Sequence, residues 1–459
     1  MVSAVARTFQ NCFKIPELKS RILFTLLVLG ICRLASLIPI PGTDARTLKE
    51  FFEHLNTGTG NGGLLGMYSL FTGGGFERCA VGALGIMPYI SATIIIQLLT
   101  AVIPTLSKLA REEGGRTKLI QYGRYLTVLI CIGQGMAMAW SWENPEKLFS
   151  GFTGQLVLHP GWWYRIETTL ILTTGTMLLM WLGEQITDRG IGNGISLVIT
   201  IGILARLPQA GQGLYDMFAR SEGFNVFHAI ALLLLFLSVI AGVIAITQAQ
   251  RKIPVQYAQR AVGRKVYSGG SSFMPLRVNY VGVMPVIFAQ AILMFPAQIL
   301  NAIGARLGDS ASGKFMVHTA SMLQERSALY LFLYALMILF FSYFWVATQF
   351  NELQIADDMK KSGGYIPGVR PGQATSDFLH RSMSRITLAG AMALVIIAVI
   401  PIILGNLMKI PFSVASFFGG TSLLIMVGVL LDTMRQMESY LLMRHYDGFL
   451  KKGRIKGRF

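Results

Sequence analysis

A chain of 459 residues is long enough for two or three soluble domains, but only 14% of these residues are charged and 53% are hydrophobic. Soluble globular proteins carry about 25% charged residues, so the composition excludes an ordinary soluble protein. The formal net charge of +17 could indicate a nucleic-acid partner. In a membrane protein, however, the distribution of charge between the loops is more informative.

Ten apolar segments approach the length of roughly 20 residues that crosses a hydrocarbon core. In chain order they are 22–41, 79–103, 122–141, 166–186, 194–207, 225–246, 278–303, 328–350, 386–405 and 411–434. The fifth is shorter than a full crossing and follows the glycine-rich sequence GIGNG, so we expect a short or tilted span. The pattern predicts an all-α, polytopic membrane protein with ten transmembrane helices.

The basic residues indicate how the spans are oriented. Most of the 40 Lys and Arg residues lie in the N-terminal tail 1–21, in the loops after the second, sixth and eighth spans, and in the C-terminal tail 435–459. Because cytoplasmic loops carry the excess of Lys and Arg, both tails are predicted to be cytoplasmic. An even number of spans agrees with this orientation.

Ten spans divide naturally into two halves of five, within 22–207 and 208–434. A half with an odd number of spans leaves the membrane on the opposite side, so a duplicated half would be inverted. We therefore hypothesise two pseudo-symmetric halves with the functional axis at their junction.

The second span contains the sequence ALGIMPYISATIIIQLLT at Ala83–Thr100. At helical spacing, Ile86 and Ile90 share one face, and Thr93 and Gln97 continue it one and two turns on. Such a stripe suits a helix with lipid on one side and a wetter environment on the other. An ordinary buried helix of a bundle explains the same pattern.

A second isoleucine pair with i, i+4 spacing, Ile195 and Ile199, follows the GIGNG sequence. Hydrophobic constrictions gate by dewetting, because a narrow aliphatic ring disfavours a column of water without blocking a larger chain that is pushed through. Isoleucine is common in membrane helices, so spacing alone does not single out these pairs.

The segment Gly60–Phe76, with the sequence GNGGLLGMYSLFTGGGF, is apolar in its middle, glycine-rich at both ends and too short to cross the membrane. Its centre could form two helical turns that are hinged by the glycines and tucked into a cavity. An external loop on the membrane surface fits the spacing equally well.

Two long loops, Thr247–Asn279 and Asn351–Ser384, are predicted on the cytoplasmic side. Loops longer than about a dozen residues are usually functional or disordered. Their basic residues suit an acidic partner, which could be RNA, anionic lipid or an acidic protein surface. A charge cluster that only fixes the topology explains the sign of the charge but not the length of the loops.

Ionisable residues within the predicted spans are few, and they include Arg33, Glu184 and Asp432. Ion-coupled transporters use carboxylates or histidines near the middle of the membrane. Glu184 and Asp432 lie at predicted cytoplasmic ends, where water reaches them. No acidic relay is therefore predicted.

Motifs for enzymatic chemistry are also missing. Gly194-Ile195-Ser196 lacks the last glycine of G-x-S-x-G, and neither GxxxxGK[ST] nor HExxH occurs. The six histidines are far apart in sequence, and the four cysteines show no regular spacing, so neither a metal site nor a disulfide framework is predicted. We expect no enzyme activity and no cofactor.

Four sequences occur in order along the chain: ALGIMPYISATIIIQLLT, MWLGEQITDRGIGNGIS (Met180–Ser196), YIPGVRPG (Tyr365–Gly372) and FGGTSLL (Phe418–Leu424). In these sequences the chain resembles the SecY family of bacterial protein-conducting channels. The resemblance runs from about Ile15 to Arg458, essentially the whole chain.

The resemblance implies a clamshell of two five-helix halves, closed on the outside by a short plug helix and able to open sideways to lipid. It also implies the function: a passive channel that passes unfolded secretory polypeptides across the membrane and releases transmembrane segments into the bilayer.

The resemblance implies roles for individual residues as well. The pore ring would consist of Ile86, Ile90, Ile195, Ile199, Ile287 and Ile425. The plug would include Leu64, Leu65, Met67, Tyr68, Leu70 and Phe71. Ser91, Gln97 and Phe295 would line the lateral gate between spans two and seven, and Arg264, Lys265 and Arg370 would dock partners. Lys265 stands where some relatives have arginine, which keeps the charge but loses the planar fork.

The partners implied by the resemblance are the SecE and SecG subunits, the SecA motor ATPase, the ribosome, signal sequences, nascent polypeptides and membrane lipids, with no direct binding of DNA. The implied location is the bacterial plasma membrane. Two alternatives are an inverted-repeat secondary transporter of a small solute, which shares the span pattern, and an intramembrane enzyme. The first needs a coupling carboxylate at mid-membrane, and the second a nucleophile with its base.

Overall fold

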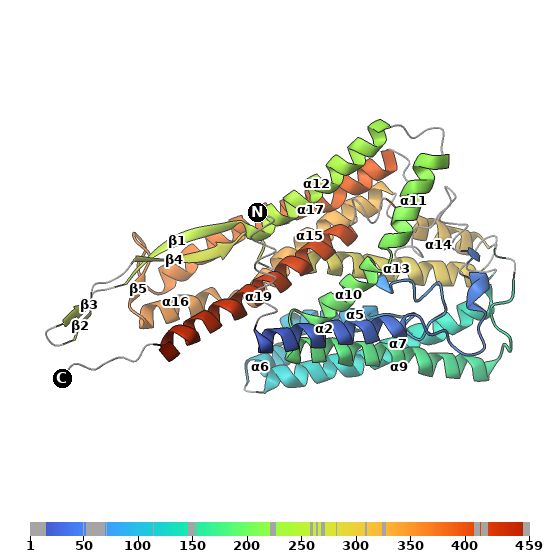
Figure 1. Cartoon of the computed structure of the whole chain (residues 1–459), viewed down its shortest axis with the longest axis horizontal. Helices are drawn as coiled ribbons and strands as arrows, with labels where there is room; N and C mark the ends of the chain where they lie inside the picture. Colours follow the sequence, from blue (N-terminus) through green and yellow to red (C-terminus); the bar gives the residue numbers. More distant parts are fainter. Residues whose placement is uncertain are drawn as a thin grey trace.

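The computed structural model describes residues 15–452, apart from 49, 52–68, 70, 113, 146–151, 153, 221–225, 258–259, 263–264, 268–270, 281, 308–309, 324–326, 408–413 and 415–420. The described chain is mostly helical (Figure 1). Each of the ten predicted spans overlaps one helix. These helices are α2 (Pro16–Ala35), α5 (Met87–Val102), α7 (Gly115–Glu143), α9 (Trp162–Arg189), α10 (Gly194–Leu204), α12 (Val226–Gln248), α13 (Met284–Leu307), α15 (Ala328–Gln349), α17 (Gln373–Leu407) and α19 (Thr421–Lys452).

Shorter helices lie between these. They are α6 (Pro104–Arg111), α11 (Leu207–Arg220), α14 (Ala311–Met322) and α16 (Glu352–Lys361). Among the described residues, six helical segments are long and apolar enough to cross a membrane, or seven if α5 and α6, which are bent by 105°, count as one broken span. The predicted multi-span helical class is confirmed, while the count of ten crossings stays a prediction.

Several predicted boundaries were wrong. The second span was expected from residue 79, but the chain forms turns up to Ile86 and α5 begins at Met87. Gly85 has a φ of +60°, which favours glycine, and Pro88 lies in the first helical turn, where a missing N–H is tolerated. At the other end of the chain, α19 continues to Lys452 through residues that were predicted to form a tail.

The helices pack in two groups. The first contains α2, α5, α7, α9 and α10, and the second contains α12, α13, α15, α17 and α19. Figure 1 shows the first group below the second. Across the boundary, α5 packs against α13 and α10 packs against α19, and one continuous hydrophobic core runs through both groups. This grouping matches the two predicted halves, and their pseudo-symmetry stays a prediction.

Two small sheets, which the sequence pattern did not predict, are formed by the first long loop together with one short strand of the second. Strands β1 (Gln250–Tyr257), β4 (Ser271–Arg277) and β5 (Gly364–Tyr365) form an antiparallel sheet of order β4-β1-β5, and β2 (Arg260–Val262) pairs with β3 (Lys265–Tyr267). The register places Gln250 opposite Arg277 and Gln256 opposite both Ser271 and Tyr365.

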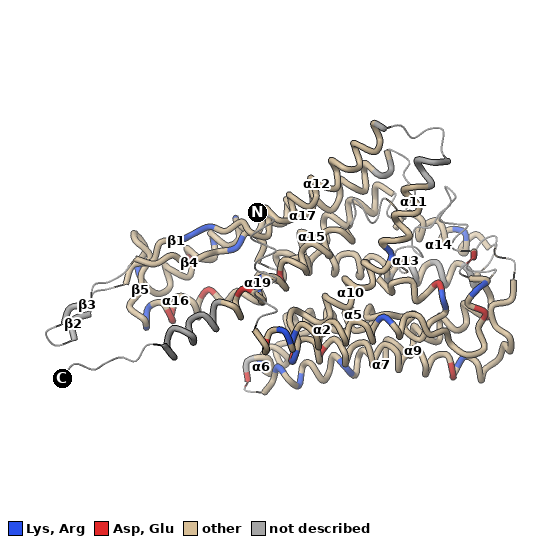
Figure 2. The backbone as a smooth tube through the Cα atoms, viewed as in Figure 1, with Lys and Arg blue, Asp and Glu red and all other residues tan. Residues whose placement is uncertain are grey.

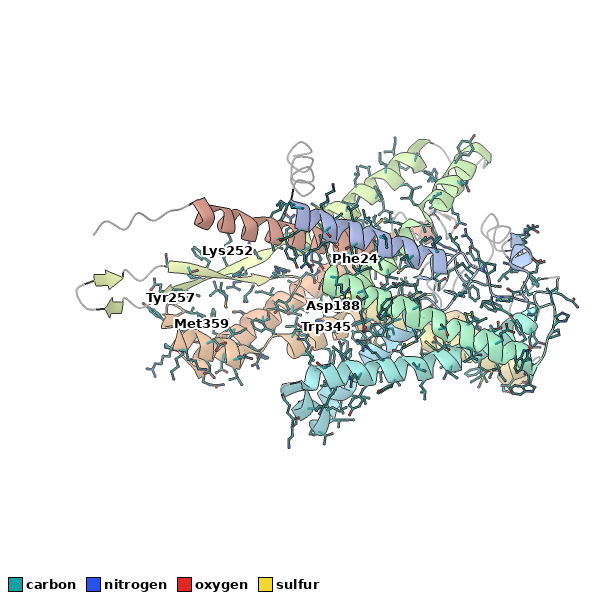
Figure 3. The ribbon with its side chains drawn as sticks, turned by 60° about the horizontal axis from the view of Figure 1, so that its bottom comes forward. Phe24, Asp188, Lys252, Tyr257, Trp345 and Met359 are labelled. Carbon is teal, nitrogen blue, oxygen red and sulfur yellow. The ribbon has the colours of Figure 1, made fainter. Side chains whose placement is uncertain are left out.

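This sheet has its own small core beyond the helical bundle. Ile253 and Val255 of β1 are buried, with exposed residues between and beside them, as a strand with one covered face requires. Ile253 packs with Leu276, Phe350 and Ile366, so the sheet is attached to α15 and to the loop before α17. Figure 3 shows Lys252, Tyr257 and Met359 in this part of the molecule, at a distance from the helical bundle.

Candidate functional site

The six isoleucines of the predicted pore ring come from four helices of both groups. Each is the N-cap or lies within the first six residues of its helix: Ile86 and Ile90 in α5, Ile195 and Ile199 in α10, Ile287 in α13 and Ile425 in α19. Four helix starts therefore determine where these side chains lie.

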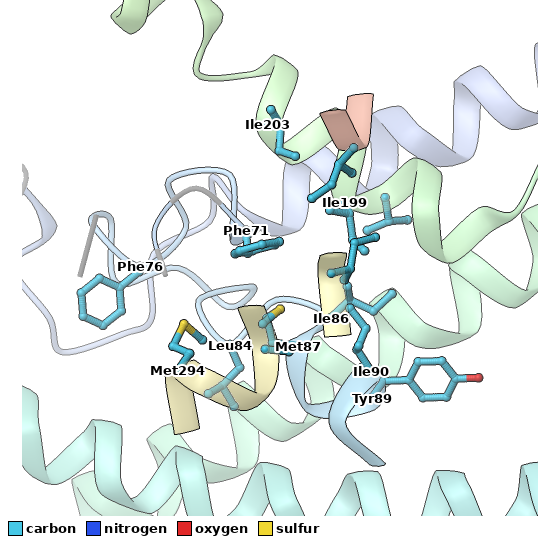
Figure 4. Close-up of a cluster of buried hydrophobic side chains, with 14 of the residues drawn as sticks. Phe71, Phe76, Leu84, Ile86, Met87, Tyr89, Ile90, Ile199, Ile203 and Met294 are labelled. Carbon is cyan, nitrogen blue, oxygen red and sulfur yellow. The ribbon is translucent and has the colours of Figure 1, made fainter. Parts of the chain in front are cut away.

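These side chains belong to, or pack against, the hydrophobic core that runs through both groups. Five of them are at most 4% exposed and belong to one hydrophobic cluster, and the half-buried Ile195 packs against it. Figure 4 shows Ile86, Ile90 and Ile199 together in this cluster. A group built only from aliphatic side chains can exclude water but offers no ligand for an ion.

The GIGNG sequence fixes the start of α10. The Asn193 side chain accepts hydrogen bonds from the backbone N–H groups of Ile195 (3.1 Å) and Ser196 (3.3 Å), an N-cap arrangement. A Cβ on Gly194 would lie only 1.8 Å from the carbonyl oxygen of Gly183, so glycine is needed where α10 crosses α9. The position of Ile195 and Ile199 follows from this crossing.

The same turn is also bonded to helices on either side of it. The Gly192 N–H donates to Oε1 of Gln436 in α19 (2.9 Å), and the Ile191 N–H donates to Oγ1 of Thr25 in α2 (3.1 Å). A single short turn therefore connects α2, α10 and α19, and sequence reasoning did not identify either side-chain partner.

Most of the predicted plug falls outside the described residues, namely Leu64, Leu65, Met67, Tyr68 and Leu70. Ser69 and the stretch 71–77 are described and buried, so this part of the segment does not lie on the molecular surface. Phe71 and Ile86 line the same small cavity of about 20 Å³, roughly the volume of one water molecule. The described end of the plug segment thus lies beside the isoleucine cluster.

The predicted lateral gate falls where α5 packs against α13. Ser91 is buried and its Oγ donates to the carbonyl oxygen of Met87 (3.0 Å). The buried Oε1 atom of Gln97 has no hydrogen-bond partner, and neither does that of Gln290 in α13. Phe295 lies in α13, and its side chain is outside the described part of the chain.

Gln290 was missed by sequence reasoning. It is 3% exposed, and an amide within the otherwise apolar stretch 280–297 was the signal that could have identified it. A buried amide without a partner is unfavourable by about 1–3 kcal/mol. Gln290 therefore weakens the packing of α13, the helix that contacts α5.

The predicted docking residues belong to the sheet region. Lys265 is the first residue of β3, and Arg264 falls outside the described residues. Arg370 is exposed, and its carbonyl oxygen accepts a hydrogen bond from Thr375 Oγ1 (2.9 Å). In the same loop, Gly368 and Gly372 have φ angles of +82° and +104°, which explains the glycines of YIPGVRPG. In Figure 2 the positions of Lys and Arg are coloured along the backbone of β1 and β4.

The charged groups of the spans have structural partners. Arg33 donates from one guanidinium nitrogen to the carbonyl oxygen of Gly73 at 2.6 Å. Glu184 accepts two hydrogen bonds from Arg124, at 3.1 and 2.7 Å. The carboxylate of Asp432 is 55% exposed. Within the described residues, no cluster of three His, Cys, Asp or Glu residues could hold a metal ion.

The sequence model of the SecY family matches residues 80–434. The chain belongs to the SecY family. It is 42% identical over 462 residues to the protein translocase subunit SecY of Chlamydia trachomatis, covering 98% of this chain and 99% of the relative. It is 42% identical over 442 residues to that of Escherichia coli strain K12, covering 96% of both chains.

A solved structure gives the fold. The chain is similar to a SecY protein whose plug domain is described as stabilising the closed state of the translocation channel, with a TM-score of 0.60, 18% identity and 91% coverage of both chains. The family resemblance and the fold class predicted from the four motifs are therefore confirmed. The roles of individual residues stay predictions.

Proposed function

We propose that this chain is the central, pore-forming subunit of a protein translocase. It is a passive channel that passes unfolded secretory polypeptides across the membrane and releases transmembrane segments sideways into lipid. The proposal is supported by six isoleucines, from two helices of each group, that belong to or pack against one hydrophobic core, with Ile86, Ile90 and Ile199 lying together in it (Figure 4). Membership of the SecY family supports the same function.

The physical demand on such a channel is to hold back ions while a polypeptide passes. A narrow passage lined by the six isoleucines, called the neck below, meets this demand because water and ions gain no polar contact inside it. Aliphatic side chains can also change rotamer around a passing chain. Phe71 beside Ile86 is consistent with a plug that fills the neck from the outer side when no polypeptide is present.

Sideways release requires two neighbouring helices that can separate. The proposed opening is the α5–α13 contact, with Ser91, Gln97 and Phe295 lining it. Unpartnered amides at Gln97 and Gln290 favour this contact, because separation lets both amides reach other partners. A hydrophobic segment then leaves the channel because lipid is the better solvent for it.

Photo-crosslinking tests the neck. A photoreactive amino acid at Ile90 should crosslink to a secretory polypeptide stalled during transport. The same group at Leu129 on α7, which is 68% exposed, is the matched control and should label lipid. Crosslinks from Leu129 but none from Ile90 would contradict the proposed path.

The basic sheet region and the loop at Arg370 are proposed as the docking surface for the SecA motor or the ribosome, because their positive charge is exposed beyond the bundle and attracts acidic surfaces. Arg370→Glu should stop SecA-driven export into vesicles. Arg116→Glu makes the same charge change at the start of α7 and should leave export intact. Normal export by the Arg370→Glu variant would contradict the proposed docking role of Arg370.

The remaining partners and the location are extensions of the same proposal. SecE and SecG subunits would complete the complex in the bacterial plasma membrane, with both termini cytoplasmic. Purification from membranes with a tag on this chain should recover two small membrane subunits. Protease added to intact, sealed spheroplasts should leave both tails uncut.

A further inference from the structure

We infer that a buried network of Ser69, Glu77 and Arg206 holds the C-terminal end of the plug segment against the end of α10, and that this attachment sets how readily the channel opens. This inference rests on the proposed function. The three residues are called the Glu77–Arg206 network below. They are positioning residues, since they act through the plug segment and not by contact with the transported chain.

The network connects parts of the chain that are far apart in sequence. Arg206 lies just beyond α10, and one of its terminal nitrogens donates to both Glu77 Oε1 and Ser69 Oγ. Ser69 Oγ also donates to Glu77 Oε1 at 2.8 Å. The exposed fractions are 0% for Ser69, 5% for Glu77 and 9% for Arg206. A charge pair this well buried is barely screened by salt.

A second attachment lies a few residues away. The Arg33 side chain of α2 donates to the carbonyl oxygen of Gly73 at 2.6 Å. Gly73 has a φ of +61°, and a Cβ there would lie 2.9 Å from Cα of Gly202 in α10. The Gly74 N–H donates back to the carbonyl oxygen of Ser69 at 2.9 Å. The segment is therefore folded on itself and held between α2 and α10.

The balance of charge explains why Glu77 matters most. Arg33 lies close enough to Arg78 and Arg206 for Coulomb repulsion, and Glu77 is the carboxylate bonded to Arg206. Loss of Glu77 leaves the buried Arg206 without its carboxylate partner and still repelled by Arg33. Loss of Arg206 leaves a buried carboxylate without its charged partner. Breaking a buried pair from either side is strongly unfavourable, so either change should release the segment.

Ion conductance of the full complex in planar bilayers tests the inference. Glu77→Gln and Arg206→Gln should each raise the open fraction of the resting channel, on the order of 100-fold or more for loss of one partner of a buried pair. Ser69→Ala removes one hydroxyl and keeps the ion pair, so it should give an increase of a few-fold. The charge-reversed double variant E77R/R206E should return the conductance most of the way to that of the unchanged protein.

The pair formed by Glu143 and Arg165 supplies the matched control. It joins the ends of α7 and α9 at 2.7 Å with a Glu143 carboxylate that is 3% exposed, but it does not bond to the plug segment. Glu143→Gln should leave the resting conductance unchanged. Preprotein transport into vesicles, measured for every variant, reports whether the variant has folded.

The outcomes separate the two proposals. If the unchanged complex transports no preprotein, the proposed function fails. If all variants transport preprotein and conduct no more than the unchanged protein, the network has no role in opening and the function stands. If conductance rises but E77R/R206E does not reduce it, or if Glu143→Gln raises it equally, the attachment by this ion pair is refuted. If a Gln variant does not fold, Ser69→Ala decides the question by the same comparison.

Discussion

The α7–α9 pair and the α5–α13 pair show two ways of holding helices together in one membrane protein. α7 and α9 are bonded at both ends: Arg124 of α7 makes two hydrogen bonds to Glu184 of α9, and Glu143 of α7 accepts from Arg165 of α9. Along their length, a Cβ on Gly135 would lie 3.3 Å from the Thr169 methyl group. Small residues allow such close approach of membrane helices.

The α5–α13 contact is held in a different way. Among the side chains that the structure describes, no hydrogen bond or ion pair joins the two helices, and each carries a buried amide oxygen without a partner, at Gln97 and Gln290. Packing between apolar side chains is non-directional, so it does not fix the relative position of the two helices. The difference agrees with the proposed lateral gate: the α7–α9 pair is bonded at its ends, whereas the pair proposed to separate is held by packing.

Removing the ion pair between Glu143 of α7 and Arg165 of α9 should have the largest effect on the free energy of unfolding. Glu143→Gln removes the charge that pairs with Arg165, while Arg165 is about a quarter exposed. We expect a loss of about 3 kcal/mol, the low end for a broken buried pair, seen as a lower Tm in detergent. Signal-sequence selectivity should not change. A loss of selectivity would show that this pair also takes part in gating.

Polar substitution in the neck should come next. Ile90→Asn places an amide among aliphatic side chains, where an unpartnered amide is unfavourable by about 1–3 kcal/mol unless water enters. Hydration of the neck relieves this, so resting ion leak should rise and weak signal sequences should be accepted. Ile90→Leu keeps the side chain apolar and serves as the control. Equal conductance of the Asn and Leu variants would contradict a gating role.

Replacing a gate amide should make the α5–α13 contact more like a permanent one. Gln290→Leu removes a buried polar group without a partner, which should stabilise the closed contact by about 1–2 kcal/mol. Export of preproteins with weak signal sequences should fall, while Tm rises slightly. The test is export of a series of signal sequences of graded hydrophobicity. Easier export of the weak signals would reverse the interpretation of this amide.

Sequence analysis predicted the features that short-range patterns determine. Apolar runs near 20 residues predicted a multi-span helical protein, and each predicted span overlaps a helix. The i, i+4 spacing and the family motifs pointed to isoleucines that the structure buries in or against the core. The sequence analysis did not predict the two sheets, because it interpreted the residues around β1 by their positive charge and not by their alternation. The alternation of buried Ile253 and Val255 with exposed neighbours was the available signal.

Contacts between distant residues could not be predicted in this way. Glu77 and Arg206 are 129 positions apart, and Arg33 and Gly73 are 40 apart. No periodicity relates such positions, because their meeting depends on how whole helices pack. A single sequence therefore showed that Arg33 needed a partner in the membrane but not which group supplied it.

The smallest expected effect concerns the second ion pair between α7 and α9, which Arg124 and Glu184 form. Arg124 is 44% exposed and Glu184 is 19% exposed, so water and ions screen this pair although its geometry is bidentate. Arg124→Ala should lower stability by about 1 kcal/mol or less, measured by thermal unfolding in detergent. Because screening weakens exposed pairs, the difference from the unchanged protein should shrink in high salt, whereas the effect of Glu143→Gln should persist. If the two variants respond alike to salt, burial does not distinguish the Arg124–Glu184 pair from the Glu143–Arg165 pair. The attachment of α7 to α9 must then come from helix packing and not from these ion pairs.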